Sequence, residues 1–406
     1  MKALIDKYAQ LAIKIGVNIQ PGQKLLVRSP LNAADFTRKI VKEAYEAGAK
    51  HVEVLWSDDD VTRTRYDLAP DEAFLEFPAY YVKAHDVAID ENWAILSVVV
   101  ANPDLLKGVP AERIANANKA AGEAMENFRQ ALQADKISWS IVAVPSPLWA
   151  AKVFPELPTD EQVEALWNAI YAATRVDQPD PITAWEQHIN TLKEKEVFLN
   201  NNHFKTMHLK AKGTDLTIDL PSKHLWCAAD STNAAGNMFL ANIPTEEVFT
   251  MPAKEGVNGV VSSTKPLIYS GNVIDNFTLT FEKGKIVDFT AEQGQDILEG
   301  LLNTDEGARY IGELALVPFD SPISNSNLLF YNTLFDENAS IHLAIGSAYA
   351  FNLEGGKTMT KEELEANGAN QSITHVDFMI GSADMSIDGI KADGTVVPVF
   401  RNGNWA

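Results

Sequence analysis

The sequence is poor in cysteine, in basic residues and in long apolar stretches, and each shortage excludes a class of protein. Cys227 is the only cysteine among 406 residues, which excludes an internal disulfide and a cysteine-based zinc site. We expect its side chain to be a small buried hydrophobe rather than a nucleophile. Lys and Arg number 34 against 55 Asp and Glu, and the net charge of −21 argues against nucleic acid as a partner. No apolar run reaches the roughly 18 residues that a membrane-spanning helix needs, so we expect no membrane contact.

Several targeting and catalytic motifs are missing as well. The N-terminus carries Asp6 and Lys7 early and has no continuous apolar segment, so we expect no signal peptide and a reduced, cytoplasmic location. GxGxxG after the first strand, GxSxG and HExxH do not occur, which removes the usual support for Rossmann-type redox chemistry, serine hydrolysis and single-helix zinc proteolysis. The stretch EGGKT (354–358) is no phosphate loop, because Phe351 stands where that loop needs glycine.

The first half of the chain alternates between apolar strands and helical segments. Apolar residues make up 46% and charged residues 22%, an ordinary globular composition in a chain long enough for two domains. Strands are predicted at 24–29, 51–57, 94–101 and 137–146, and helical segments at 33–49, 111–134 and 159–174. This order and the continuous apolar strands predict an α/β domain with a mostly parallel sheet.

The pattern changes around residues 177–185. Segments 206–221 and 277–291 alternate apolar and polar residues about turns that contain glycine, which predicts antiparallel hairpins, and 294–302 is predicted to be a helix. We therefore expect an α/β domain over 1–185 and a β-rich α+β domain over 186–406.

Residues 371–384, QSITHVDFMIGSAD, place two polar side chains inside an apolar run. In a strand, His375 and Asp377 point to the same face, so their side chains lie together. Burying them is costly unless they have partners. Taken alone, the pair is most simply interpreted as a histidine and an aspartate that satisfy each other within a sheet.

Other polar residues occur in similar surroundings in the second half. They are Glu246 and Glu247 in ANIPTEEVFTMPAK, Glu313 in YIGELALVPF, and Glu337, His342 and Tyr349 in FDENASIHLAIGSAYAF. Each has an ordinary structural interpretation by itself. Together, two histidines and several carboxylates without sulfur suit a pair of divalent cations that share a carboxylate. Spacing cannot prove that they converge, because they are far apart in the sequence.

NIPTEEVFTMP, GELALV, LFDENASIHLAIGSAYAF and THVDFMIGS resemble, in order and spacing, the aminopeptidase T/aminopeptidase S family of bacterial metallo-exopeptidases. The likeness runs from YAQLAIKIGVNIQPGQKLLV to DMSIDGI and so covers nearly the whole chain. The resemblance implies a two-domain, homodimeric, cytoplasmic enzyme that removes N-terminal residues from peptides with a free N-terminus. It also implies two divalent metal ions per chain, zinc or cobalt, with manganese or magnesium as alternatives.

Carried over to this sequence, the family's metal ligands fall on Glu247, Glu313, His342, His375 and Asp377, and its active-site tyrosine on Tyr349. Glu247 is chosen over Glu246 because its distance to Glu313 matches the family, and Glu246 should point to the opposite face. We expect Glu313 to bridge the two metals, a water between them to be the nucleophile, Tyr349 to stabilise the oxyanion and Glu337 to move the proton. A loop insertion around 354–371 would alter the pocket rim rather than the ligands.

Two other functions compete with the aminopeptidase. The same ligands serve a two-metal phosphoesterase or amidase, although phosphate sites usually recruit Arg or Lys and the strands nearest the ligands are poor in them. A non-catalytic ligand-binding protein would hold no tightly bound metal.

Overall fold

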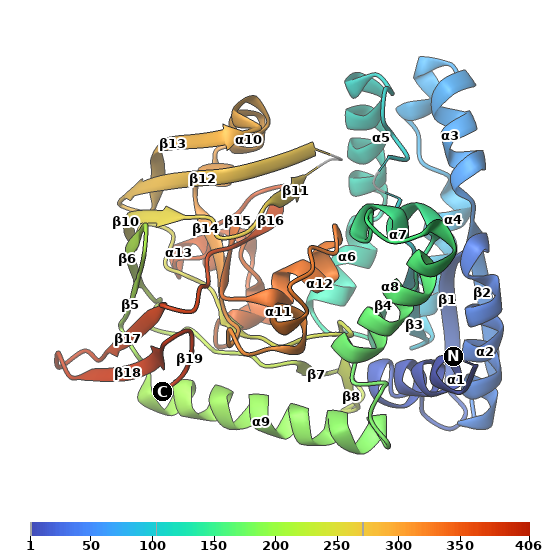
Figure 1. The fold of residues 1–406 in the computed structure, drawn as a ribbon, viewed down its shortest axis with the longest axis horizontal. Helices are drawn as coiled ribbons and strands as arrows, with labels where there is room; N and C mark the ends of the chain where they lie inside the picture. The colour runs from blue at the N-terminus through green and yellow to red at the C-terminus, as the bar shows by residue number, and fades with distance from the viewer. Residues whose placement is uncertain (1, 103, 270–271) are drawn as a thin grey trace. The chain divides into compact units, whose positions relative to one another are not determined.

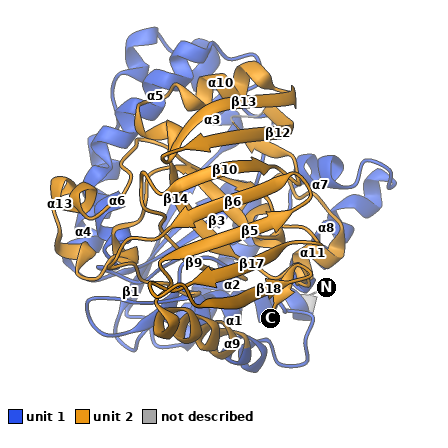
Figure 2. Cartoon of the chain, turned by 90° about the vertical axis from the view of Figure 1, so that its left-hand side faces the viewer, with its two compact units in different colours: residues 1–187, 230–244 blue, residues 188–229, 245–406 orange. Residues whose placement is uncertain are grey.

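The computed structural model describes residues 2–102, 104–269 and 272–406, which fold into two compact units (Figure 1). Unit 1 consists of the chain up to Gln187 together with Asp230–Pro244, and unit 2 of His188–Ala229 and Thr245–Ala406 (Figure 2). The domain boundary expected between residues 185 and 186 lies inside helix α9 (Pro181–Asn202) and stays a prediction. No helix in the described part of the chain is long and apolar enough to span a membrane.

Unit 1 contains a four-stranded sheet of order β2-β1-β3-β4 in which every pair is parallel. This confirms the predicted α/β architecture. Its strands are β1 (Lys24–Pro30), β2 (His51–Ser57), β3 (Ala94–Val99) and β4 (Trp139–Ala143). Its helices are α1 (Lys2–Leu11), α2 (Ala34–Glu46), α3 (Asp59–Leu68), α4 (Ala79–Asp90), α5 (Ala111–Ala124), α6 (Glu126–Gln133), α7 (Pro147–Val153) and α8 (Thr159–Ala173).

Helix packing in unit 1 follows from the apolar faces of its strands. Leu26 and Ile95 of the sheet lie in one core cluster with Ile89 of α4 and Phe128 of α6. The helical segment predicted over 111–134 is two helices, separated at Met125. Residues 230–244 also belong to this unit: they form the hairpin of β7 (Asp230–Thr232) and β8 (Met238–Leu240) and then hydrogen-bond to Ile141 of β4.

Unit 2 is built on antiparallel sheets, as predicted. Figure 2 looks onto the larger sheet, whose order is β11-β12-β10-β6-β5-β17-β18-β19, with β13 paired to β12. The predicted hairpins are β5–β6 and β12–β13, and the helix predicted over 294–302 is α10. The strands are β5 (Thr206–Ala211), β6 (Thr214–Asp219), β10 (Val257–Ser262), β11 (Leu267–Tyr269), β12 (Asn272–Glu282), β13 (Lys285–Gln293), β17 (Ser386–Ile390), β18 (Val396–Arg401) and β19 (Asn404–Trp405). The helices that follow are α10 (Gln295–Leu302), α11 (Pro322–Ser326), α12 (Thr333–Asp336) and α13 (Lys361–Ala366).

A second antiparallel sheet of unit 2, of order β16-β15-β14-β9, carries four of the five predicted metal ligands, and the fifth, Glu247, directly precedes β9. Its strands are β9 (Val248–Thr250), β14 (Ile311–Leu316), β15 (His342–Gly346) and β16 (His375–Met379). Side chains alternate between the two faces of a strand. One face is apolar and belongs to the main core of the unit, with Leu314, Leu343, Ile345 and Phe378 all fully buried. The opposite face holds the candidate ligands.

Candidate metal centre

The ligand face of this sheet alternates acids and imidazoles with very small residues. His375 stands opposite Gly346 in the β15–β16 register, and Asp377 stands opposite Ala344. Residues directly opposite each other share a face, so glycine and alanine leave room above the sheet between the longer side chains. As the i, i+2 spacing predicts, the side chains of His375 and Asp377 lie together, with Nε2 and Oδ1 3.4 Å apart.

Glu313 reaches this face through an irregularity in β14. The β14–β15 register shifts between Ile311 and Glu313, so that Ile311 stays in the apolar core while Glu313 stands opposite Ala344. Gly346 allows β16 to lie close to β15 at this point. Its φ is +107°, and a Cβ there would lie 2.2 Å from the Thr374 carbonyl oxygen. A side chain at position 346 would therefore displace the start of the strand that carries His375.

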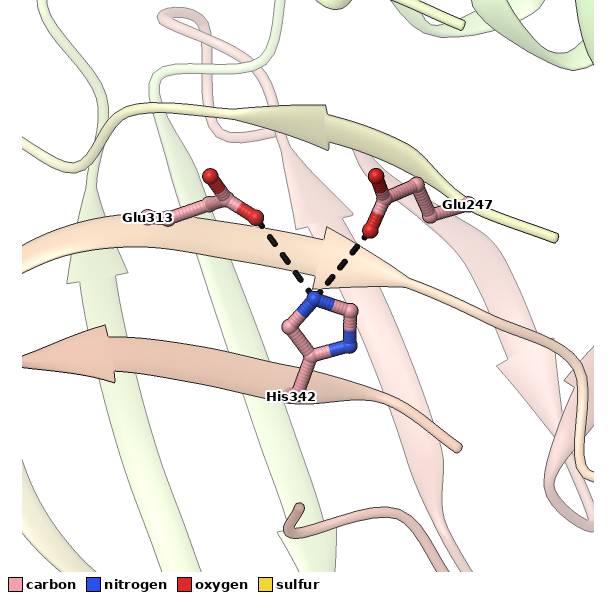
Figure 3. A group of neighbouring side chains, drawn as sticks. All are labelled: Glu247, Glu313 and His342. Carbon is pink, nitrogen blue, oxygen red and sulfur yellow. Dashed lines mark ion pairs between the residues drawn. The ribbon is translucent and has the colours of Figure 1, made fainter. Parts of the chain in front are cut away.

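Five of the predicted residues form two groups that share Glu313. Glu247, Glu313 and His342 offer ligand atoms that all lie within 4.8 Å of one another, and so do Glu313, His375 and Asp377. Figure 3 shows the first group, in which the carboxylates of Glu247 and Glu313 point toward the same imidazole nitrogen. The Nε2 atom of His342 lies 3.2 Å from Glu247 Oε2 and 3.5 Å from Glu313 Oε1. The other oxygen of Glu313, Oε2, lies 3.6 Å from His375 Nε2.

Backbone carbonyl groups orient both imidazole rings. His342 Nδ1 lies 3.2 Å from the Ser340 oxygen, and His375 Nδ1 lies 2.8 Å from the Ser347 oxygen. A carbonyl oxygen only accepts, so Nδ1 must carry the proton in each ring. The Nε2 atoms then face the carboxylates, and Nε2 is the atom that each ring would offer to a cation.

The pKa values of the residues in the centre are shifted because several acidic and imidazole side chains are buried close together. Burial raises the pKa of Glu313, and burial together with the nearby Asp377 raises the pKa of Glu337 well above its usual range. Burial alone would lower the pKa of His342, but hydrogen bonds to two glutamates outweigh it and raise the pKa well above the usual value. Burial likewise opposes ionisation of His375, whose pKa the Asp377 carboxylate raises to about 10. The attraction to His375 outweighs burial at Asp377 and lowers its pKa.

The residues of the centre fit divalent cations. All five side chains offer oxygen or nitrogen donors, which suit zinc, cobalt, manganese and magnesium to different degrees. Asp377 Oδ1 is buried and, although His375 Nε2 lies 3.4 Å away, it accepts no hydrogen bond of good geometry among the described residues. A buried carboxylate oxygen without a hydrogen bond is costly, and a cation would satisfy it.

Glu337 and Tyr349 lie at the edges of the two ligand groups and belong to neither. Glu337 and Asp377 line a common cavity of about 10 Å³, enough for about one water molecule. The ring of Tyr349 lies 4.7 Å from that of His375, centroid to centroid, and stacks on Phe351. Burial and then the Glu313 carboxylate raise the pKa of Tyr349 well above its usual value, so its hydroxyl stays a neutral donor.

Glu246 points away from the centre, as expected for the neighbour of Glu247. Its Oε2 atom lies 3.4 Å from Nε2 of His188 in α9. Sequence reasoning missed this partner. It also missed the roles of Ser340 and Ser347, because these residues act through backbone carbonyl groups, which every residue type has. Asn338, inside DENAS, was also missed, although a fully buried asparagine next to a candidate catalytic acid is a usable signal.

Comparisons with known proteins agree with the chemistry of this centre. The family described as thermophilic metalloprotease (M29) matches residues 1–405. Aminopeptidase AmpS of Bacillus subtilis (strain 168) is 58% identical over 402 residues, which cover 99% of this chain and 98% of that protein. Aminopeptidase T of Thermus thermophilus is 42% identical over 404 residues, covering 100% and 98%. The solved structure of wild-type AmpT from Thermus thermophilus superposes with a TM-score of 0.94 at 41% identity and covers 100% of this chain and 99% of that one.

Proposed function

Because this chain belongs to the thermophilic metalloprotease family and is a metallo-aminopeptidase, we propose that it cleaves the N-terminal residue from peptides at a centre of two divalent cations. Glu247, Glu313 and His342 would hold one cation, and Glu313, His375 and Asp377 the other. The names of the relatives favour this function over a phosphoesterase and over a non-catalytic binding protein.

The position of Glu313 carries the proposal of two cations rather than one. Its two carboxylate oxygens face different histidines: Oε1 is 3.5 Å from His342 Nε2, and Oε2 is 3.6 Å from His375 Nε2. A carboxylate that offers one oxygen to each of two ligand groups is suited to bridge two ions. Glu313 also lies on strand β14 and is only 4% exposed, so its carboxylate is held in one position, as a bridging ligand requires.

We infer zinc or cobalt as the ions, with manganese or magnesium as alternatives, because the ligands combine imidazole nitrogen with carboxylate oxygen. When bound, such a pair would polarise the scissile carbonyl, hold the free α-amine of the substrate and lower the pKa of a shared water from about 15.7 towards about 7.

The protein's own groups would complete the reaction. The Tyr349 hydroxyl would donate a hydrogen bond to the oxyanion that forms when water attacks the peptide carbonyl. Glu337, next to Asp377, would take the proton from the attacking water and deliver it to the leaving amine, so that the C–N bond breaks as a neutral amine departs. The Nδ1–H groups of His342 and His375 would stay hydrogen-bonded to the backbone carbonyl oxygens throughout. We further propose that the enzyme is a homodimer and works in the cytoplasm.

The test of this function is hydrolysis of leucine p-nitroanilide before and after treatment with a chelator. We expect the chelator to abolish activity and a divalent cation to restore it. Nα-acetyl-leucine p-nitroanilide and p-nitrophenyl phosphate are the matched controls, and neither should be cleaved. Full activity in excess chelator refutes the metal mechanism, and cleavage of the acetylated substrate at an equal rate refutes the requirement for a free amine.

A further inference from the structure

Asn338 is a fully buried amide beside the carboxylate of Glu337. Its Oδ1 atom accepts a hydrogen bond from the Glu246 backbone N–H at 2.7 Å. Its Nδ2 atom donates to the Leu334 carbonyl oxygen at 3.1 Å and lies 3.4 Å from Glu337 Oε1. The side chain therefore links the backbone next to Glu247 with the turn that carries Glu337.

The orientation of this amide is fixed by its surroundings. The Glu246 N–H can only donate, so it must face Oδ1, and the Leu334 carbonyl oxygen can only accept, so it must face Nδ2. The backbone of Asn338 is anchored too, because its carbonyl oxygen accepts from Ser321 Oγ at 3.2 Å. A flipped amide would set two acceptors against each other and leave a buried N–H without an acceptor.

The hydrogen bond from the Glu246 N–H accounts for the Oδ1 atom of Asn338 but not for its Nδ2 atom. A residue with only an acceptor would serve that N–H equally well. The Nδ2 donor instead lies between the Leu334 carbonyl oxygen of α12 and the carboxylate of Glu337, a residue that lines a cavity together with Asp377. Glu337 has a flexible side chain, and proton transfer requires its carboxylate to be held at one position.

We propose that Asn338 is a positioning residue that holds the Glu337 carboxylate in place relative to the backbone that presents Glu247. This inference rests on the proposed function, because it assumes that Glu337 transfers the proton. Asn338 itself touches no substrate; it acts through Glu337. Removing its Nδ2 donor should leave the metal ligands in place and should slow the chemical step.

The variant Asn338→Asp tests this directly, because it keeps the acceptor for the Glu246 N–H and replaces the donor that faces Glu337. Asn200→Asp is the matched control: the Asn200 amide also pairs with backbone groups of unit 2, the N–H and carbonyl of Trp226, and contacts no carboxylate of the centre in the hydrogen bonds described. For leucine p-nitroanilide we expect kcat of Asn338→Asp to fall about 10–100-fold with KM nearly unchanged, because a misplacement of about 1 Å can cost roughly 10²-fold in rate. Metal content per chain should equal that of the wild type, and Asn200→Asp should keep kcat within about twofold.

A double-mutant cycle with Glu337→Gln separates positioning from a general structural role. If Asn338 acts through Glu337, adding Asn338→Asp to Glu337→Gln should cost less than about threefold in kcat. A full additional loss in that background overturns the proposal, and so does a kcat of Asn338→Asp equal to that of Asn200→Asp. If Asn338→Asp does not fold, Asn338→Ala takes its place in the same cycle; failure of both to fold also overturns it, since the amide would then be a requirement of the fold.

The wild-type enzyme is assayed first, with and without chelator. A wild type that shows no metal-dependent release of N-terminal residues refutes the proposed function before any variant is compared. A wild type that behaves as proposed, together with an additive cycle, refutes only the positioning role of Asn338.

Discussion

Replacing Tyr349 by phenylalanine removes one hydroxyl group from the candidate centre and little else. The Tyr349 ring stacks on Phe351 with centroids 5.1 Å apart and planes at 10°, and it lies 4.7 Å from the His375 ring. Phenylalanine keeps both contacts. The substitution therefore separates the hydrogen bond that we assign to the oxyanion from the packing of the aromatic side chains.

The expected effects on rate and on stability differ in size. Loss of one donor to a developing oxyanion costs about 10²–10³-fold in kcat, or roughly 2.7–4 kcal/mol of transition-state stabilisation. The free energy of unfolding should change by no more than about 1 kcal/mol, since the ring contacts remain. A large change in kcat with a small change in stability is the signature of a catalytic hydroxyl.

The assay is steady-state hydrolysis of leucine p-nitroanilide with saturating metal, alongside denaturant unfolding of the same samples. Tyr310→Phe is the matched control, because its ring lies in the same unit with Lys254 Nζ 5.0 Å from its centroid. We expect the control to keep its kcat, and Tyr349→Phe to lose kcat rather than raise KM. An unchanged kcat in Tyr349→Phe would remove Tyr349 from the mechanism.

Three further predictions concern Glu313, Gly346 and, in unit 1, His85. Glu313→Gln should lose bound metal as well as activity, since one residue serves both ligand groups; elemental analysis that finds both ions retained would rule out bridging. Gly346→Ala should destabilise the enzyme by about 1–3 kcal/mol and weaken metal binding, because the φ of +107° and the Thr374 oxygen 2.2 Å from the new Cβ oppose a side chain; calorimetry showing wild-type stability would contradict this. Burial lowers the pKa of His85, whose Nδ1–H donates to the Tyr81 carbonyl. As the pH drops below about 6.5, the imidazole therefore becomes a cation in the unfolded chain before it does so in the folded protein, and the free energy of unfolding falls. His85→Gln should reduce the loss of unfolding free energy between pH 7.5 and 5.5, and an identical loss in the variant would count against this assignment.

The parts of the fold that could be predicted from the sequence depend on local periodicity. The two hairpins of unit 2 and the parallel strands of unit 1 have clear alternating or continuous apolar patterns, and the structure confirms both classes of sheet. Helix α9 was missed because its charged and apolar residues show no strong stripe. Its start is nevertheless marked by Asp180, which accepts from the N–H groups of Ile182 and Thr183, followed by Pro181 at the first helical position.

The candidate centre could be predicted only in part, for a physical reason. Strand periodicity places His375 and Asp377 on one face, and a carboxylate inside an apolar run singles out Glu313. What brings these residues together is the pairing of four strands that are far apart in the sequence, and no local pattern encodes that pairing. The bridging role of Glu313 was expected from the sequence. Which histidine faces which of its two oxygens, and the amide bridge of Asn338, depend on this long-range geometry and emerge only from the structure.

The most direct test of the central proposal is an anomalous difference map from crystals of the enzyme grown with zinc or cobalt, recorded at the absorption edge of the metal. The proposal predicts two peaks about 3.5–4 Å apart, one beside Glu247 and His342 and the other beside His375 and Asp377, with Glu313 in contact with both. A single peak, or peaks that Glu313 does not touch, would contradict it.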